Sequence, residues 1–145
     1  MLLTHRTELA LRLLMLLALQ ADDAEPLAVP DAADRLRVST HHLAKVAQDL
    51  AHLGAVDTVR GRAGGLRLRP EARQRRLGEI VRALEPVLLA ECFEGGANNC
   101  VLAPACRLSG ALQAASDAFF AALDHHTIAD LVARPTQLRR LLAVR

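Results

Sequence analysis

Aromatic side chains are scarce in this sequence of 145 residues, which has three phenylalanines and neither tryptophan nor tyrosine. Proteins that hold single-stranded nucleic acids usually stack the bases on aromatic rings. The scarcity therefore argues against that class, and against a sugar-binding cleft floored by rings. The hydrophobic fraction of 52% is too high for a disordered chain. A chain of this length can form one core, or a small domain with an appendage.

Long hydrophobic runs are also absent. The longest apolar stretch, residues 9–21, is interrupted by Arg12 and followed by Asp22 and Asp23. A membrane span needs about 20 apolar residues, so this stretch is typical of a buried helix rather than of a membrane or signal segment. We therefore expect a cytoplasmic protein with no membrane partner.

Cysteine is rare, but its three copies, Cys92, Cys100 and Cys106, fall within 15 residues. In a cytoplasmic chain such a cluster suggests metal or redox chemistry rather than disulfides. The spacing C-x₇-C-x₅-C differs from that of zinc ribbons and of thioredoxin motifs. Three thiolates on a glycine-rich loop could hold an iron–sulfur cluster with a fourth ligand from elsewhere. A zinc clamp and three ordinary cysteines are the alternatives.

Positive charge is concentrated locally although the net charge is only +2. Residues 60–76 contain seven arginines and a single acid, Glu71. These charges repel one another unless an anion lies opposite, and phosphate is the usual anion. The alternative is a solvated face of a slightly basic protein.

The order of predicted elements indicates a winged helix-turn-helix. Residues 7–21 predict a helix, and a short helix over 30–36 ends at a turn before Ser39, the predicted N-cap of the next helix. That helix carries one apolar face: Leu43, Val46, Ala47, Leu50 and Leu53. Alternating runs on either side of a glycine-rich turn then predict a β-hairpin that ends near residue 70. A short helix, a turn, an amphipathic helix and a basic hairpin follow one another in winged helix-turn-helix domains.

The rest of the chain predicts further helices. A short helix over 77–84 precedes the cysteine loop, and a long helix follows over residues 105–123. Its apolar stripe favours a dimerisation helix, although packing within the monomer is the alternative. Thr127 and Asp130 predict the cap of a last helix. The predicted fold is mainly α with a small β-hairpin wing. Its divisions are a DNA-binding domain (1–78), a connecting helix with the cysteine loop (79–107), and a dimerisation helix with a C-terminal helix (108–145).

The winged helix-turn-helix prediction assigns roles in binding double-stranded DNA. The N-terminal end of the recognition helix offers hydrogen-bonding groups to base edges in the major groove. At the hairpin tip, arginines can enter the minor groove or contact phosphates. The expected base contacts are Ser39, Thr40, His41 and Lys45; the expected minor-groove residues are Arg60 and Arg62; and the expected phosphate contacts are Arg67 and Arg69.

Several motifs together carry a family resemblance over nearly the whole chain. They include Leu3-Thr4-x-x-Thr7, Ser39-x-x-His42-Leu43, Arg60-Gly61-x-x-Gly64-Gly65, and Asn99-Cys100-Val101-Leu102-x-Pro104-Ala105-Cys106. On these residues the chain resembles the winged-helix iron–sulfur repressors that include IscR and RirA, and most of all the nitric-oxide-sensing NsrR type.

The resemblance implies a homodimeric transcriptional repressor that binds palindromic promoter DNA while its cluster, usually [4Fe–4S], is intact. Nitric oxide attacks the cluster irons and releases the repressor. The three cysteines take the ligand positions, and the fourth ligand is an aspartate of the partner subunit. This chain has Glu8 at that position instead of aspartate, so a [2Fe–2S] cluster is the alternative to [4Fe–4S]. Arg12 is expected to hold the Glu8 carboxylate, and His125 and His126 are alternative ligands that we expect to be solvated.

Two other functions remain to be weighed. An enzyme is not supported, because the sequence has no nucleotide fingerprint, no nucleophile elbow and no base beside a reactive thiol. The alternative to a nitric oxide sensor is an iron–sulfur transcriptional regulator of the same fold that responds to iron or redox status.

Overall fold

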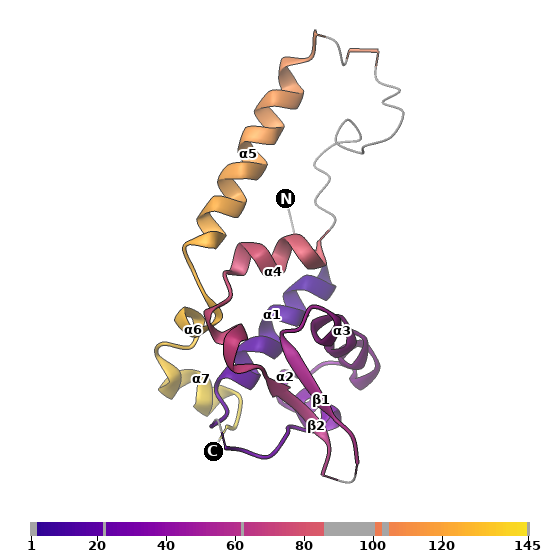
Figure 1. Cartoon of the computed structure of the whole chain (residues 1–145), viewed down its shortest axis with the longest axis vertical. Coiled ribbons are helices and arrows are strands. Elements are labelled where there is room, and N and C mark those ends of the chain that lie inside the picture. The colour runs from indigo at the N-terminus through magenta and orange to yellow at the C-terminus, as the bar shows by residue number, and fades with distance from the viewer. Residues whose placement is uncertain (1–2, 22, 62, 86–100, 103–104, 145) are drawn as a thin grey trace.

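The computed structural model describes residues 3–21, 23–61, 63–85, 101–102 and 105–144. Its elements, in chain order, are α1 (His5–Ala18), α2 (Val29–Leu36), α3 (Thr40–His52), β1 (Val56–Val59), β2 (Gly65–Leu68), the 3₁₀ helix η1 (Pro70–Gln74), α4 (Leu77–Leu84), α5 (Arg107–Asp124), α6 (Ile128–Leu131) and α7 (Pro135–Leu141). The predicted winged helix-turn-helix, mainly α with one hairpin, is confirmed. Figure 1 shows α5 extending away from the body that the other elements form.

The central helix α1 begins two residues earlier than predicted and ends three residues earlier. Thr4 caps it, because the Thr4 side chain accepts a hydrogen bond from the Thr7 N–H at 3.3 Å. Leu19 closes the other end with a backbone bond to Met15. Leucines on several sides of α1 are buried, so this helix lies inside the body, with α2, α3, α4 and α6 packed around it.

The turn between α2 and α3 depends on a left-handed residue. Arg37 has φ 56° and ψ 49°, and its N–H bonds to the Ala33 and Asp34 carbonyls to close α2. This conformation turns the chain so that α3 can start after Ser39. Leu43 and Leu50 of α3 are fully buried against α1 and α2, as the apolar spacing predicted.

The wing is an antiparallel pair in which Val56 faces Leu68 and Val59 faces Gly65. Leu27 adds a short bridge to Leu66, with N···O distances of 2.9 and 2.8 Å. A Cβ on Gly65 would lie 2.5 Å from the Leu27 carbonyl, so glycine permits this close approach. The bridge ties the base of the wing to the segment after α1.

The long helix α5 is joined to α4 at one end. Gly78 of α4 lies so close to α5 that a Cβ there would be 2.9 Å from the Phe120 carbonyl oxygen. Arg82 donates two hydrogen bonds to Asp124, at 3.0 and 2.8 Å, and its guanidinium lies 4.5 Å from the Phe120 ring centroid. These hydrogen bonds hold the pKa of Asp124 below its ordinary value.

Beyond α5 the chain returns to the body. Thr127 and Asp130 form the predicted capping box of α6, and Ile128 is fully buried. The predicted last helix is in fact two short helices, because α6 ends at Leu131 and Pro135 starts α7. None of the described helices combines the length and apolarity that crossing a membrane requires.

Candidate DNA-binding face and cluster-binding residues

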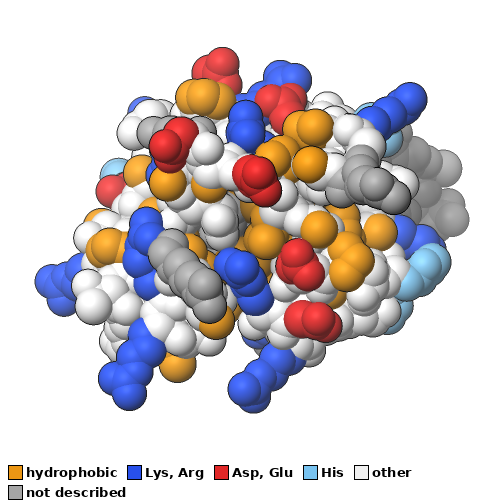
Figure 2. Space-filling view, turned by 90° about the horizontal axis from the view of Figure 1, so that it is seen from below, with side chains coloured by type: hydrophobic (Ala, Val, Ile, Leu, Met, Phe, Trp, Pro, Cys, Tyr) orange, Lys and Arg blue, Asp and Glu red, His pale blue; other side chains and the backbone are white. Residues whose placement is uncertain are grey.

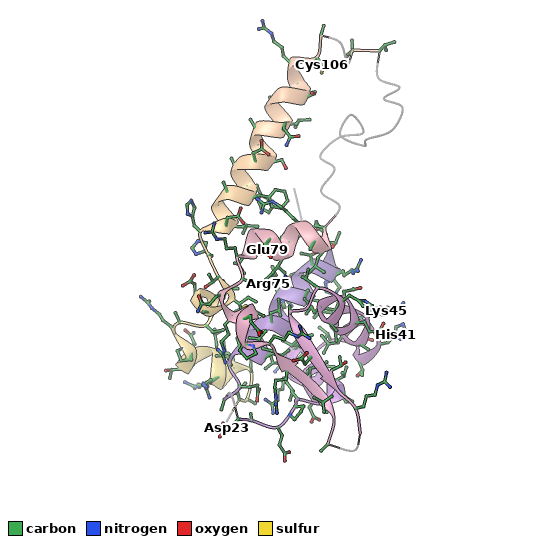
Figure 3. The ribbon with its side chains drawn as sticks, viewed as in Figure 1. Asp23, His41, Lys45, Arg75, Glu79 and Cys106 are labelled. Atoms are coloured by element: carbon green, nitrogen blue, oxygen red, sulfur yellow. The ribbon has the colours of Figure 1, made fainter. Side chains whose placement is uncertain are left out.

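One face of α3 presents polar side chains to solvent. Ser39, Thr40, His41 and Lys45 are all exposed, while the opposite face is packed into the core. Figure 3 shows His41 and Lys45 on the outer side of the body. Ser39 occupies the predicted N-cap position of α3, but its side chain makes no capping hydrogen bond there. This face can offer hydroxyl, imidazole and ammonium groups to a major groove.

The wing tip carries one exposed arginine that the structure describes, Arg60. Gly61, beside it, has φ 108°, a conformation that glycine adopts without strain. Arg62 lies outside the described residues, so its predicted role stays a prediction.

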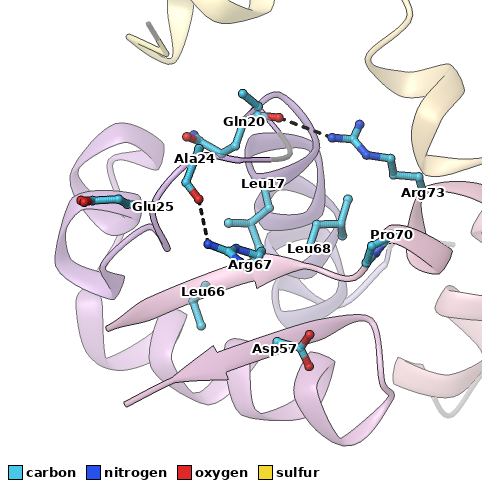
Figure 4. Close-up of a pocket in the computed structure, with 11 residues that line it drawn as sticks. Leu17, Gln20, Ala24, Glu25, Asp57, Leu66, Arg67, Leu68, Pro70 and Arg73 are labelled. Atoms are coloured by element: carbon cyan, nitrogen blue, oxygen red, sulfur yellow. Dashed lines mark hydrogen bonds between the residues drawn. The ribbon is translucent and has the colours of Figure 1, made fainter. Parts of the chain in front are cut away.

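Arginines nearer the base of the wing have partners within the chain. Arg67 donates to the Ala24 carbonyl at 2.9 Å (Figure 4), and Arg69 forms an ion pair with Asp57 at 2.7 Å. Arg73 and Arg75 donate to carbonyls at the ends of α1 and α3. Several arginines of this basic segment therefore stabilise contacts within the chain itself. Phosphate contacts by Arg67 and Arg69 remain predictions.

The lower surface of the molecule shows the same mixing of charge. Figure 2 shows lysine and arginine side chains spread around this face, with acidic and hydrophobic side chains between them. The face seen in this view is therefore not one continuous basic patch.

Glu8 lies in the first turn of α1 with its side chain 47% exposed. The predicted pair between Glu8 and Arg12 is confirmed by a hydrogen bond from the guanidinium to the carboxylate. His5 Nδ1 lies 3.7 Å from the other carboxylate oxygen. Arg12 thus orients Glu8 at the surface. His125 and His126 are exposed, as expected.

Cys106 is the one cysteine that the structure describes; Cys92 and Cys100 lie outside the described residues. Cys106 is half-buried, has a free thiol and occupies the N-cap position of α5. Figure 3 shows it at the end of α5 that is remote from the body. Within the described part of the chain, no three His, Cys, Asp or Glu side chains are grouped to hold a metal ion.

A buried carboxylate joins the end of α4 to the start of α1. Glu85 is 8% exposed and accepts hydrogen bonds from the Thr4 N–H, from Thr4 Oγ1 at 2.7 Å and from Thr7 Oγ1 at 2.8 Å. Burial opposes ionisation of Glu85, but these hydrogen bonds and the charge of Arg6 outweigh it and keep the pKa below its ordinary value. The residues are 78 and 81 positions apart, so local sequence patterns give no sign of this contact.

In the same turn, Arg6 connects α1 to α3. Its Nε donates to Asp49 Oδ2 at 2.7 Å. This hydrogen bond raises the pKa of Arg6. The first turn of α1 therefore contacts α3 through Arg6 and the end of α4 through Thr4 and Thr7, and it also carries Glu8.

Known proteins support the winged helix-turn-helix interpretation. The chain is 43% identical over 141 residues to the transcriptional regulator NsrR of Shouchella clausii, covering 97% of this chain and 94% of that protein. It is 48% identical over 134 residues to the transcriptional repressor NsrR of Streptomyces coelicolor, covering 92% and 90%.

Solved structures agree on the fold. T. potens IscR has a TM-score of 0.71 at 22% identity, with 96% of this chain and 91% of that chain covered. CymR, the global cysteine regulator of B. subtilis, has a TM-score of 0.67 at 25% identity, with 92% and 97% covered. The sequence model of the Rrf2 family, described as iron-dependent transcriptional regulator, matches residues 3–134. The chain therefore belongs to the Rrf2 family of transcriptional regulators, which agrees with the prediction that it is not an enzyme.

Proposed function

We propose that this chain is a nitric-oxide-sensitive iron–sulfur repressor that binds palindromic promoter DNA as a homodimer. The observation that carries the proposal is the match over nearly the full chain to several regulators named NsrR, at 35–48% identity. The exposed polar face of α3 and the exposed Arg60 at the wing tip support the DNA-binding part.

The proposed cluster ligands are Cys92, Cys100 and Cys106, with Glu8 of the partner subunit as the fourth. A [4Fe–4S] cluster is the expected form, and nitric oxide reacts with it when it is bound. The exposed, Arg12-oriented Glu8 carboxylate fits a donor that reaches outward, since its oxygens point to solvent rather than into the core. A carboxylate is a harder donor than thiolate, so Glu8 would be a weaker ligand than the three cysteines for a soft cluster.

A homodimer is supported by the shape of the chain. Helix α5 has 18 residues, about 27 Å at 1.5 Å per residue, and among its described side chains only Ser116 and Phe120 are buried. Leu108, near its start, is 65% exposed. If two copies of the chain packed along α5, they would cover its exposed apolar side chains, such as Leu108. The two α3 helices of such a dimer would then contact DNA half-sites about 34 Å apart.

The central test is a gel shift of the protein, purified without oxygen, on a duplex from its own promoter. We expect binding that nitric oxide abolishes, together with an iron–sulfur absorption band that bleaches. A colourless zinc protein would refute the sensor.

Glu8→Ala and Glu8→Asp form the matched pair for the fourth ligand. The alanine variant should retain a cluster on its cysteines but respond weakly to nitric oxide or bind DNA differently, whereas aspartate should preserve the response. Unchanged DNA affinity and nitric oxide response in Glu8→Ala would rule out this ligand role.

The alternative is a regulator that senses iron or redox status, which the description of the family as iron-dependent favours. It predicts that DNA binding follows cluster content and changes little on a brief exposure to nitric oxide. The same gel shift, repeated with and without iron in the growth medium, separates the two functions.

A further inference from the structure

A cleft between the start of α1 and α3 lies beside the face that we assign to DNA. It has a volume of about 520 Å³ and is lined by His5, Arg6, His42, Lys45 and Asp49, among others. Arg6 and Lys45 bring basic side chains to the cleft, and both histidines are exposed and can donate through a ring N–H. Donors from two separate helices thus converge on one open hollow.

Arg6 is held in a particular orientation in this cleft. Asp49 accepts a hydrogen bond from Nε of Arg6, and the terminal nitrogens of that guanidinium have no hydrogen-bond partner in the part of the chain that the structure describes. The Arg6 side chain is 56% exposed. A guanidinium fixed through Nε presents its remaining N–H groups in a planar fork, which matches the oxygens of a phosphate.

The position of the cleft relative to the wing indicates which DNA strand it could contact. In Figure 1, α3 lies between the wing and the start of α1, which is beside the end of α4. An α-helix with its side chains is about 10–12 Å wide and fills a major groove about 12 Å wide. A recognition helix in that groove therefore has a phosphate strand on each side, and the wing can contact only one of them.

We propose that the α1–α3 cleft binds a backbone phosphate of the DNA strand on the side of α3 opposite the wing. Arg6 is the main charged contact, His5 and His42 are further donors, and Lys45, which also lines the cleft, contacts this phosphate instead of the base edge first expected for it. This inference rests on the proposed DNA binding and adds a second phosphate contact to it. Phosphate contacts fix the position of a protein on the duplex and are independent of base sequence. The cleft and the wing would thus hold α3 in the groove from both sides.

The test compares Arg6→Gln with wild type on a duplex that the wild-type protein selects from a random pool. Arg140→Gln is the matched control, because Arg140 is an exposed arginine of α7, on the other side of the body from α3 in Figure 1. Protein purified without oxygen and matched for iron content is titrated with the duplex between about 50 and 200 mM salt. Circular dichroism and thermal unfolding verify that each variant is folded.

The proposal expects Arg6→Gln to bind about tenfold more weakly at low salt, with the slope of log K against log salt reduced by about 1 for each bound subunit. The proposal also expects Arg6→Gln to lose the same factor in affinity on the selected duplex and on duplexes with base changes in the selected site. Substituting single phosphates by methylphosphonate should weaken wild-type binding at a position away from the wing, and this effect should vanish in Arg6→Gln.

Two results would overturn the inference while leaving the proposed function standing. One is an affinity and slope equal to those of Arg140→Gln. The other is weaker binding with an unchanged slope, because Arg6 would then act only through Asp49 on the position of α3. Failure of the wild-type protein to select or bind any duplex would overturn both proposals together.

Discussion

The buried Glu85 carboxylate should contribute strongly to the stability of the body, and its removal is the sharpest test of the contacts described above. Glu85→Ala would leave the buried Thr7 hydroxyl and the Thr4 N–H without their acceptor. Hydrogen bonds to charged groups contribute about 1.5–3 kcal/mol each, and not additively, so we expect a loss of about 3 kcal/mol in the free energy of unfolding. For a chain of this size that corresponds to about 9 °C in the midpoint of thermal unfolding.

Glu85→Gln keeps the size of the side chain and one acceptor oxygen, so about 2 kcal/mol should be lost. The control is Glu79→Gln, because among the described residues the Glu79 side chain contacts Arg75 alone, at 3.5 Å and near the surface, so the change in stability should be less than about 1 kcal/mol. Urea unfolding at equal protein concentration measures all three variants. A Glu85→Ala protein within about 0.5 kcal/mol of wild type would refute the reasoning.

The pH dependence has a defined sign. Because the folded protein lowers the pKa of Glu85, its contribution is fully present above the unfolded value of about 4.5 and is lost as pH falls through the lower folded value. Gln at this position does not titrate. The difference in stability between wild type and Glu85→Gln should therefore be constant from pH 7 to about pH 5 and shrink below pH 4.5, and a difference that grows on acidification would contradict the assigned direction.

Two further substitutions test the backbone geometry. Arg37→Gly should raise the free energy of unfolding by about 0.5–1 kcal/mol, because a left-handed conformation is strained for arginine and not for glycine; a lower urea midpoint would contradict this. Gly78→Ala should lower the thermal midpoint, because the overpacking cost of about 1–3 kcal/mol exceeds the helix-propensity gain of about 1 kcal/mol. The added Cβ would collide with Asp124 Oδ1, so the double variant Gly78→Ala with Asp124→Ala should recover part of the loss. A Gly78→Ala protein as stable as wild type would contradict the close packing of α4 against α5.

The sequence predicts those elements whose pattern is local. The spacing of Leu43, Val46 and Leu50 locates α3, since one apolar face must turn toward the core. The wing follows from two alternating runs around glycines, and α4 falls on the predicted residues 77–84. The long helix was expected over 105–123 and is found at Arg107–Asp124.

Contacts between distant residues could not be predicted from the sequence. A cluster of arginines has the same composition whether it contacts DNA or bonds to carbonyls of its own chain, and Arg73 and Arg75 do the latter. Glu85 and Arg6 resemble ordinary surface residues until the fold brings Thr7 and Asp49 to them. The pairing of Glu8 with Arg12 was predictable, because i, i+4 neighbours meet on any helix.

Because α5 is long and contacts α4 near one end, a small rotation at this contact moves the other end of α5 a long way. In the part of the chain that the structure describes, α5 meets α4 at the end near Asp124, through Gly78 and Arg82, while Cys106 lies at the other end. Over an arm of about 27 Å, a rotation of about 10° at this contact displaces the Cys106 end by about 5 Å, more than twice the length of a bond from sulfur to metal. The close fit of a glycine against the Phe120 carbonyl oxygen therefore sets the precision with which a thiol far from it is positioned.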